Sequence, residues 1–132
     1  MKIFAISMVK DEDDIIEYTC RHLFAIGVDE ILIFHGPSID STASLLLNLA
    51  KEFPERLYVY ADEVPYWQAQ KMTRLLHKAR EHGADWVIPF DADELVVMPP
   101  GLALRDALEG RSWIVLTIPV VTHVATSEDD ST

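Results

Sequence analysis

The hydrophobic positions of the chain follow two alternating patterns. Short runs of branched and aromatic residues are typical of buried parallel strands, and they occur at residues 3–9, 30–34, 57–60, 86–90 and 113–121. Between them, apolar residues recur every three or four positions, which predicts helices at 15–24, 41–52, 68–82 and 102–108. Strands that alternate with helices indicate right-handed βαβ units. We therefore expect an α/β fold with three α/β/α layers around a mostly parallel sheet.

Length and charge narrow the class of protein. The chain has 132 residues, of which 49% are hydrophobic, so we expect one domain over residues 1–126 and a polar tail at 127–132. The net charge of −11 argues against nucleic acid or an anionic membrane as the main partner. The single cysteine, Cys20, excludes an internal disulfide framework and fits a reducing compartment. No apolar run approaches the roughly 20 residues of a membrane span, which favours a cytoplasmic protein.

Polar clusters follow three of the predicted strands. They read KDEDD after the first strand, HGPSIDST after the second and DADE after the fourth. In open parallel sheets, ligands bind beyond the carboxyl ends of the strands, where these clusters should meet. The first two clusters also have a structural interpretation, because Asp11 or Asp13 could cap the first helix and Asp40 could cap the second. Lys10 and Glu12 lie closest to their strand and are the better candidates to line a site.

The DADE cluster points to a cation site. If the chain stays extended beyond Phe90, the side chains of Asp91 and Asp93 point to the same side. Paired carboxylates suit a hard cation such as Mg²⁺ or Mn²⁺, which keeps further coordination positions for phosphate oxygens. The alternative is a polar turn in which an aspartate caps the next element.

The third predicted helix carries basic side chains close to this cluster. Its expected apolar face consists of Met72, Leu75, Leu76 and Ala79, whereas the side chains off that face are Gln68, Lys71, Arg74 and Lys78. Such residues usually form a solvated face, but this helix leads directly into the DADE strand. Its N-terminal half could therefore bring positive charge to a bound diphosphate, and the guanidinium of Arg74 suits bidentate pairing with phosphate.

Several sequence motifs are absent. The chain contains no GxGxxG and no GxxxxGK[ST], so neither a dinucleotide fingerprint nor a P-loop is supported. A receiver-like signalling domain that binds Mg²⁺ is an alternative, because acidic residues follow the first strand. That class needs a phosphoacceptor aspartate after the third strand and a lysine after the fifth. The last lysine here is Lys78, which disfavours this alternative.

Three segments together resemble the GT-A glycosyltransferases, and specifically the family 2-like proteins. They are MVKDEDDIIEYTCRHLFAIGVDEILIFHGPSIDST, WQAQKMTRLLHKAREHGADW and VIPFDADEL. The first is similar to the opening strand, the helix ending in a G-V-D turn, and the second strand with its N-x-S-x-D-x-T loop. The last is similar to the DxD motif. In order and spacing the resemblance covers roughly residues 2 to 100 of the chain.

The resemblance implies a UDP- or GDP-sugar as donor and Mn²⁺ or Mg²⁺ as cofactor. It implies that Asp40 contacts the base, that Asp91 lies near the ribose, and that Asp93 binds the metal with Asp91 beside it. The other residues implied to bind the nucleotide sugar are Val9, Lys10, Glu12, Gln68 and Arg74.

The resemblance also implies that this chain is the nucleotide-sugar-binding half of a longer fold. In the family the second half holds the acceptor site and the catalytic base, so no residue of this chain is expected to be the base. Two interpretations of the function follow. The chain is part of a metal-dependent glycosyltransferase with an unknown acceptor, or it is a nucleotide-binding remnant without transfer activity.

Overall fold

The computed structural model describes residues 1–61 and 67–110. Its elements are β1 (Ile3–Val9), α1 (Ile16–Ala25), β2 (Glu30–His35), α2 (Thr42–Glu52), β3 (Leu57–Ala61), α3 (Gln68–Glu81), β4 (Trp86–Pro89) and α4 (Leu104–Leu108). These strands and helices confirm the sequence predictions to within a few residues at each end. The predicted strand at 113–121 and the predicted tail at 127–132 lie outside the described residues.

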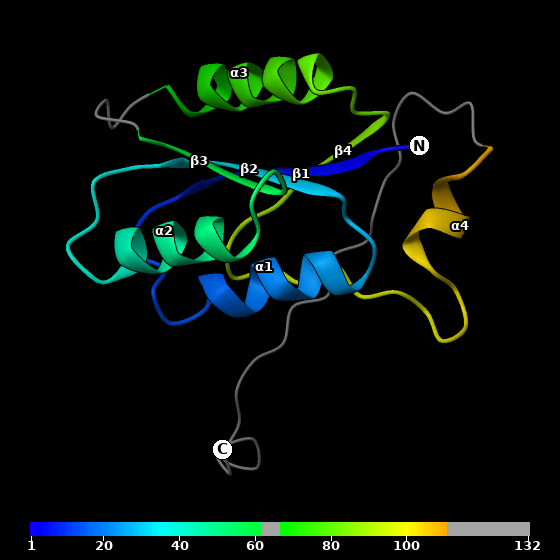
Figure 1. Cartoon of the computed structure of the whole chain (residues 1–132), viewed down its shortest axis with the longest axis horizontal. Coiled ribbons are helices and arrows are strands. Elements are labelled where there is room, and N and C mark those ends of the chain that lie inside the picture. The colour runs from blue at the N-terminus through cyan, green and yellow to red at the C-terminus, as the bar shows by residue number, and fades with distance from the viewer. Residues whose placement is uncertain (62–66, 111–132) are drawn as a thin grey trace, which may run out of the picture.

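The four strands form one parallel sheet in the order β3-β2-β1-β4 (Figure 1). The chain steps outward from β1 to β2 and β3, and then crosses back to place β4 on the other side of β1. This reversal makes a topological switch point between β1 and β4, and ligands of open α/β sheets bind at the carboxyl side of such a point.

The strand order also distinguishes this fold from that of receiver domains. Receiver domains have the order 2-1-3-4-5, in which the third strand pairs with the first. Here β3 pairs with β2, so the receiver-like alternative is wrong.

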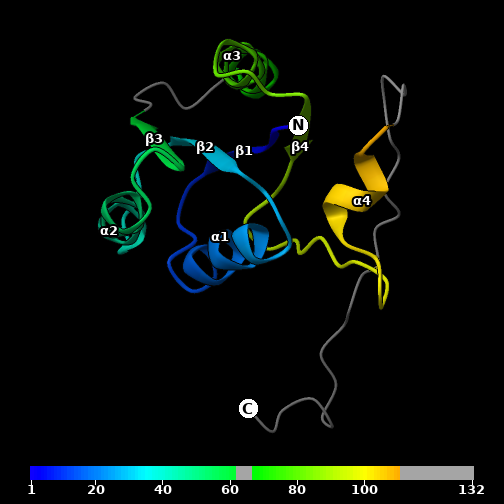
Figure 2. The same cartoon turned by 45° about the vertical axis from the view of Figure 1, so that its right-hand side comes forward.

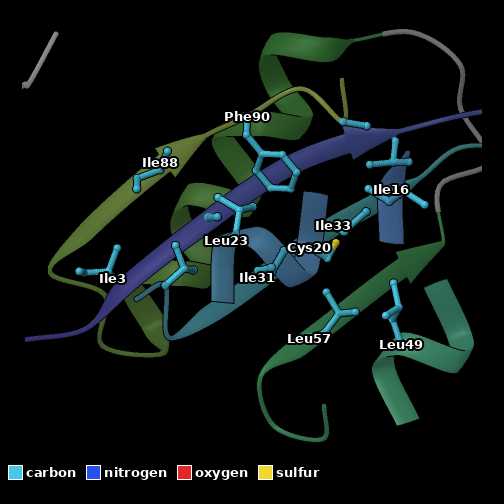
Figure 3. Close-up of a cluster of buried hydrophobic side chains, with 14 of the residues drawn as sticks. Ile3, Ile16, Cys20, Leu23, Ile31, Ile33, Leu49, Leu57, Ile88 and Phe90 are labelled. Atoms are coloured by element: carbon cyan, nitrogen blue, oxygen red, sulfur yellow. The ribbon is translucent and has the colours of Figure 1, made fainter. Parts of the chain in front are cut away.

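Helices cover both faces of the sheet, as the three-layer prediction requires. Figures 1 and 2 show α3 on one face and α1 with α2 on the other. Side chains alternate along β1, so that Phe4 and Ile6 pack toward α3 while Ile3 and Ala5 pack toward α1. Figure 3 shows the larger of the two hydrophobic clusters, in which α1 contributes Ile16, Cys20 and Leu23. Gly27, with φ of 112°, ends α1 in a conformation that favours glycine.

The buried stripe of α3 differs from the one that the sequence predicted. Leu75 and Ala79 are fully buried, and Lys71 is only 6% exposed. Leu76, which was expected in the core, is 40% exposed. Buried positions four residues apart define a narrow stripe, which turns residue 76 outward and brings residue 71 against the sheet. The apolar stem of a lysine can pack in this way, so Lys71 does not belong to the solvated face.

After β4 the chain returns along the face of the sheet that carries α1, and it ends the described part in α4 (Figure 2). Leu104 and Leu108 of α4 are buried in the same cluster as α1. Arg105 donates from Nη2 to both carboxylate oxygens of Asp29, at 3.0 and 2.8 Å, and from Nη1 to the carbonyl of Met1 at 2.6 Å. These bonds fasten α4 to the amino edge of the sheet. No helix in the described part of the chain is long and apolar enough to cross a membrane.

Candidate functional site

Backbone-to-side-chain hydrogen bonds join the loops that follow β1 and β2. The Asp11 carboxylate accepts from the backbone N–H of Ile39 at 2.8 Å, and the Asp13 carboxylate accepts from the backbone N–H of Ser41 at 3.2 Å. In the other direction, backbone N–H groups of the first loop donate to side chains of the second, and these pairs are Asp11 with Ser38, Glu12 with Thr42, and Asp13 with Asp40. Two of the three predicted clusters therefore form one connected surface.

These bonds replace the predicted cap of the first helix. The N-cap position of α1 is Ile15, and no side chain caps it. Asp11 adopts a left-handed φ of 53°, which aspartate tolerates better than most residues, and together with Asp13 it bonds the neighbouring loop. The cap interpretation of Asp11 and Asp13 is therefore wrong, because the N–H groups of the second loop bind these carboxylates.

Asp40 holds the beginning of α2. One carboxylate oxygen accepts from both the backbone N–H and the hydroxyl of Thr42, and the other accepts from the backbone N–H of Asp13. The hydroxyl of Thr42 is the main reason why the pKa of Asp40 lies below its ordinary value. The N-cap position of α2 is Ser41, and no side chain caps it, so Asp40 is not the N-cap that the sequence suggested and instead bonds Thr42 from one residue before that position. Its contact with a nucleobase stays a prediction.

The DADE segment forms a turn, the second of the two conformations that the sequence left open, and does not stay extended beyond Phe90. The backbone N–H of Glu94 donates to the carbonyl of Asp91 at 3.0 Å, which closes a turn around Ala92 and Asp93. Ala92, at the second position of this turn, is 4% exposed and packs in the core, whereas the acidic side chains next to it are exposed. The turn gathers these side chains more closely than an extended strand would.

Carboxylate oxygens of Asp91, Asp93 and Glu94 lie within 4.8 Å of one another, and all three residues are exposed. This donor set consists of hard oxygen ligands that can surround one divalent cation, so it fits the Mg²⁺ or Mn²⁺ that the sequence implied. Glu94 was missing from the predicted ligands. The sequence feature that could have identified Glu94 as a ligand is its position three residues after Asp91, because a turn brings side chains at this spacing together.

Glu12 extends the negative charge of this cluster toward the other loops. It is half-buried, and burial raises the pKa of its carboxyl above the ordinary value, with further contributions from Asp93, Asp14, Asp40 and Asp91. Partial loss of hydration raises the pKa of the exposed Glu94 as well, and the charge of Asp91 is the next cause. Carboxylates from the loops after β1, β2 and β4 therefore share one electrostatic environment at the switch point.

The raised pKa of Glu12 predicts how stability depends on pH. A carboxyl with a higher pKa in the folded state stabilises the protein below its unfolded pKa, and this contribution disappears as the pH rises through the folded pKa. Glu12→Gln should therefore raise the melting temperature of the metal-free protein at pH 7 and leave it unchanged below about pH 4, where glutamate is protonated in either state. Thermal melts from pH 3 to pH 8 measure this difference.

Glu109→Gln is the matched control for this experiment, because Glu109 is exposed just after α4, away from the acidic cluster. It should show no such pH-dependent gain. If the two variants change the melting temperature equally at every pH, the environment of Glu12 does not destabilise its charged form.

A hollow of about 300 Å³ lies on the α3 side of the DADE turn. Gln68 of α3 lines it together with Asp91 and Glu94, so the structure brings the predicted Gln68 to the acidic cluster. The remaining lining residues are Met8, Met72, Pro89 and Phe90. The sequence did not predict that the two methionines line a site, because its hydrophobic pattern assigned Met8 only to a strand and Met72 only to a helix.

The structure does not bring Arg74 to this hollow. Arg74 lines a separate hollow of about 410 Å³ beside Phe34, Tyr60 and Lys78, and Lys78 places its ammonium 4.5 Å from the centroid of the Tyr60 ring. Arg74 lies six residues from Gln68 along α3, which points it to another side of the helix. Its contact with a diphosphate stays a prediction.

Val9 and Lys10 occupy different environments at the end of β1. Val9 is 2% exposed within the core, and its carbonyl accepts from the backbone N–H of Gly36 at 3.0 Å. Lys10 is exposed, and its Cβ would lie 3.7 Å from a Cβ added at Gly36, so its side chain rests against this glycine. Of the two, the side chain of Lys10 is the one that solvent reaches.

Comparisons with known proteins place the fold. No protein-family model matches the chain, and no curated protein matches it in sequence. Among solved structures it is similar to TarS of S. aureus, a glycosyltransferase, with a TM-score of 0.56 and 16% identity over 72% of this chain. The match spans 17% of the TarS chain. The chain therefore shares its α/β fold with part of the TarS chain, and a fold of this kind can support several activities.

Proposed function

We propose that this chain is the donor-binding part of a glycosyltransferase of the GT-A, family 2-like class. The observation that carries the proposal is the convergence of Asp91, Asp93 and Glu94 within 4.8 Å, at the carboxyl end of β4 and beside the switch point. A fold shared with a glycosyltransferase supports it, as do the sequence segments that resemble family 2. The donor is a nucleotide-diphosphate sugar, and the UDP and GDP forms are the first to test.

Charge gives the physical reason for a metal requirement. A diphosphate carries negative charge, and the described residues of the switch point present carboxylates of Glu12, Asp91, Asp93 and Glu94. Two like unit charges about 4 Å apart repel by about 1 kcal/mol in bulk water and by about 4 kcal/mol near a protein surface. A divalent cation, when bound, would neutralise this repulsion and withdraw charge from the departing nucleotide diphosphate.

The residues of the chain would divide the binding of the donor between them. Asp91, Asp93 and Glu94 would hold the cation, and the loops bonded through Asp11, Asp13 and Asp40 would shape the wall for the nucleoside. Gln68, which lines the hollow beside Glu94, would donate an amide hydrogen bond to the sugar or phosphate oxygens. The catalytic base and the acceptor site would belong to a further part of the fold.

Calorimetry tests this proposal directly. UDP and GDP should bind in the presence of Mn²⁺ or Mg²⁺, and chelation of the metal should weaken binding at least about tenfold, or about 1.4 kcal/mol. The same titration with Arg74→Ala shows whether that guanidinium reaches the diphosphate. Equal nucleotide affinity with and without chelator would contradict the metal-dependent site.

A nucleotide-binding remnant without transfer activity is the second candidate, because the acidic cluster of Asp91, Asp93 and Glu94 can hold a cation and a nucleotide without any transfer step. The two candidates make the same prediction for binding and differ in turnover. Hydrolysis of UDP- or GDP-sugars by the chain with Mn²⁺ would indicate an active donor site. Tight metal-dependent binding without release of nucleotide diphosphate would favour the remnant.

A further inference from the structure

Two side chains of α1 bind the backbone of the segment that carries the acidic cluster. The hydroxyl of Thr19 donates to the carbonyl of Ala92 at 2.5 Å, and Nε2 of His22 lies 2.7 Å from the carbonyl of Val96. Ala92 stands between Asp91 and Asp93, so the two contacts lie on either side of Asp93 and Glu94. Neither contact belongs to a strand or to a helix ladder.

The chemistry of both contacts is unambiguous. A carbonyl oxygen can only accept, so Nε2 of His22 must carry the proton, and it donates whether the ring is neutral or charged. Thr19 is fully buried on the otherwise apolar face that contains Ile16, Cys20 and Leu23. A buried hydroxyl needs a partner, and among the described residues the carbonyl of Ala92 is the one that accepts from it.

The segment between β4 and α4 belongs to neither a strand nor a helix. β4 ends at Pro89, and its last backbone bond to β1 on this side runs from the N–H of Phe90 to the carbonyl of Ile6 at 3.0 Å. Beyond this point, the turn bond from Glu94 to Asp91 closes the loop on itself but does not fix it to the rest of the protein. Thr19 and His22, one turn apart on α1, provide hydrogen bonds that attach the segment to the protein, in addition to the packing of Ala92 and Val96 against the core.

We propose that Thr19 and His22 are positioning residues for the cation site. They hold the backbone carbonyls of Ala92 and Val96, and thereby fix the spacing of the carboxylates of Asp91, Asp93 and Glu94. The inference rests on the proposed metal site, and it adds a role for α1 that the acidic motif itself does not contain. Side chains that orient metal ligands typically change metal affinity by about 10- to 100-fold when they are replaced.

The test is Mn²⁺ affinity without nucleotide, measured from the electron paramagnetic resonance signal of free Mn²⁺. Thr19→Val keeps the shape but removes the donor, and it should weaken Mn²⁺ binding about tenfold or more. Thr19→Ser restores the hydroxyl and should recover most of the affinity. His22→Leu should weaken binding in the same way, whereas His22→Gln, which keeps an N–H donor, should weaken it less.

Two controls separate positioning from loss of stability and from failure of the site itself. Ile31→Val removes one buried methylene near the amino edge of the sheet, far from the DADE turn, and it should leave Mn²⁺ affinity unchanged. If Thr19→Val binds Mn²⁺ as well as Ile31→Val does, while Asp93→Asn has lost binding, the positioning role is wrong and the metal site stands. If the unmodified chain does not bind Mn²⁺, the metal site and the positioning role are both wrong.

Discussion

Asp93→Asn should abolish most of the stabilisation that Mn²⁺ and UDP together confer on the protein. Ligand present at about 100 times its Kd adds about 2.7 kcal/mol to the free energy of unfolding, which is roughly a 10 °C rise in Tm for a domain of this size. Asparagine keeps the shape of the side chain but removes a charged ligand from a cluster whose oxygens lie within 4.8 Å. The variant without metal should be as stable as the unmodified protein or slightly more stable, because one repulsive charge is gone.

Melting curves of both proteins, with and without Mn²⁺ and UDP, provide the measurement. Asp106→Asn is the control, since Asp106 is an exposed aspartate on α4, away from the DADE turn. If Asp93 serves only as a polar turn residue, Asp93→Asn is nearly neutral and the ligand-induced rise survives in full. That outcome would mean that the DADE segment has only a structural role.

Leu75→Ala should produce the largest loss of stability among changes on α3, at about 2–5 kcal/mol. Leu75 is fully buried between α3 and the sheet, in the cluster that contains Phe4, Ile6 and Leu32. Truncation removes contacts on all sides and leaves a cavity that the strands cannot fill without moving. Urea unfolding measured by circular dichroism gives the change in the free energy of unfolding.

The adjacent Leu76 is the matched control, because the substitution is chemically identical and the side chain is 40% exposed. Leu76→Ala should cost less than about 1 kcal/mol. The comparison tests the register of α3 directly, since the sequence pattern assigns both leucines to the buried face. Similar losses for the two variants would mean that α3 is rotated relative to the arrangement described above.

The order of strands and helices was predictable because hydrophobic periodicity is a local property. Residues 3–9 form a run that is apolar except for Ser7, and its length and its branched residues favour a strand that is buried on both faces. The candidate cation site was predictable for a related reason. DADE follows an apolar strand directly, and parallel strands end at the edge where ligands bind.

Other parts of the site depend on contacts between distant segments. Glu94 joins Asp91 and Asp93 because the chain turns at Ala92 and Asp93, and in this turn Ala92 packs against core residues that are distant in the sequence. Asp11 and Asp13 were expected to cap α1, which lies next to them in sequence. Their carboxylates instead bind backbone N–H groups of Ile39 and Ser41, 28 residues away.

The sequence by itself determined the class of fold, the identity of the strands and the acidic residues at the carboxyl end of β4. These features follow from periodicity and from residue type, which act over a few neighbouring positions. The tertiary structure decided the strand order β3-β2-β1-β4, the burial of Lys71 and the attachment of the DADE turn to Thr19. Each of these depends on which distant groups meet once the core is packed, because a hydrogen bond or a buried contact needs a partner that local sequence does not specify.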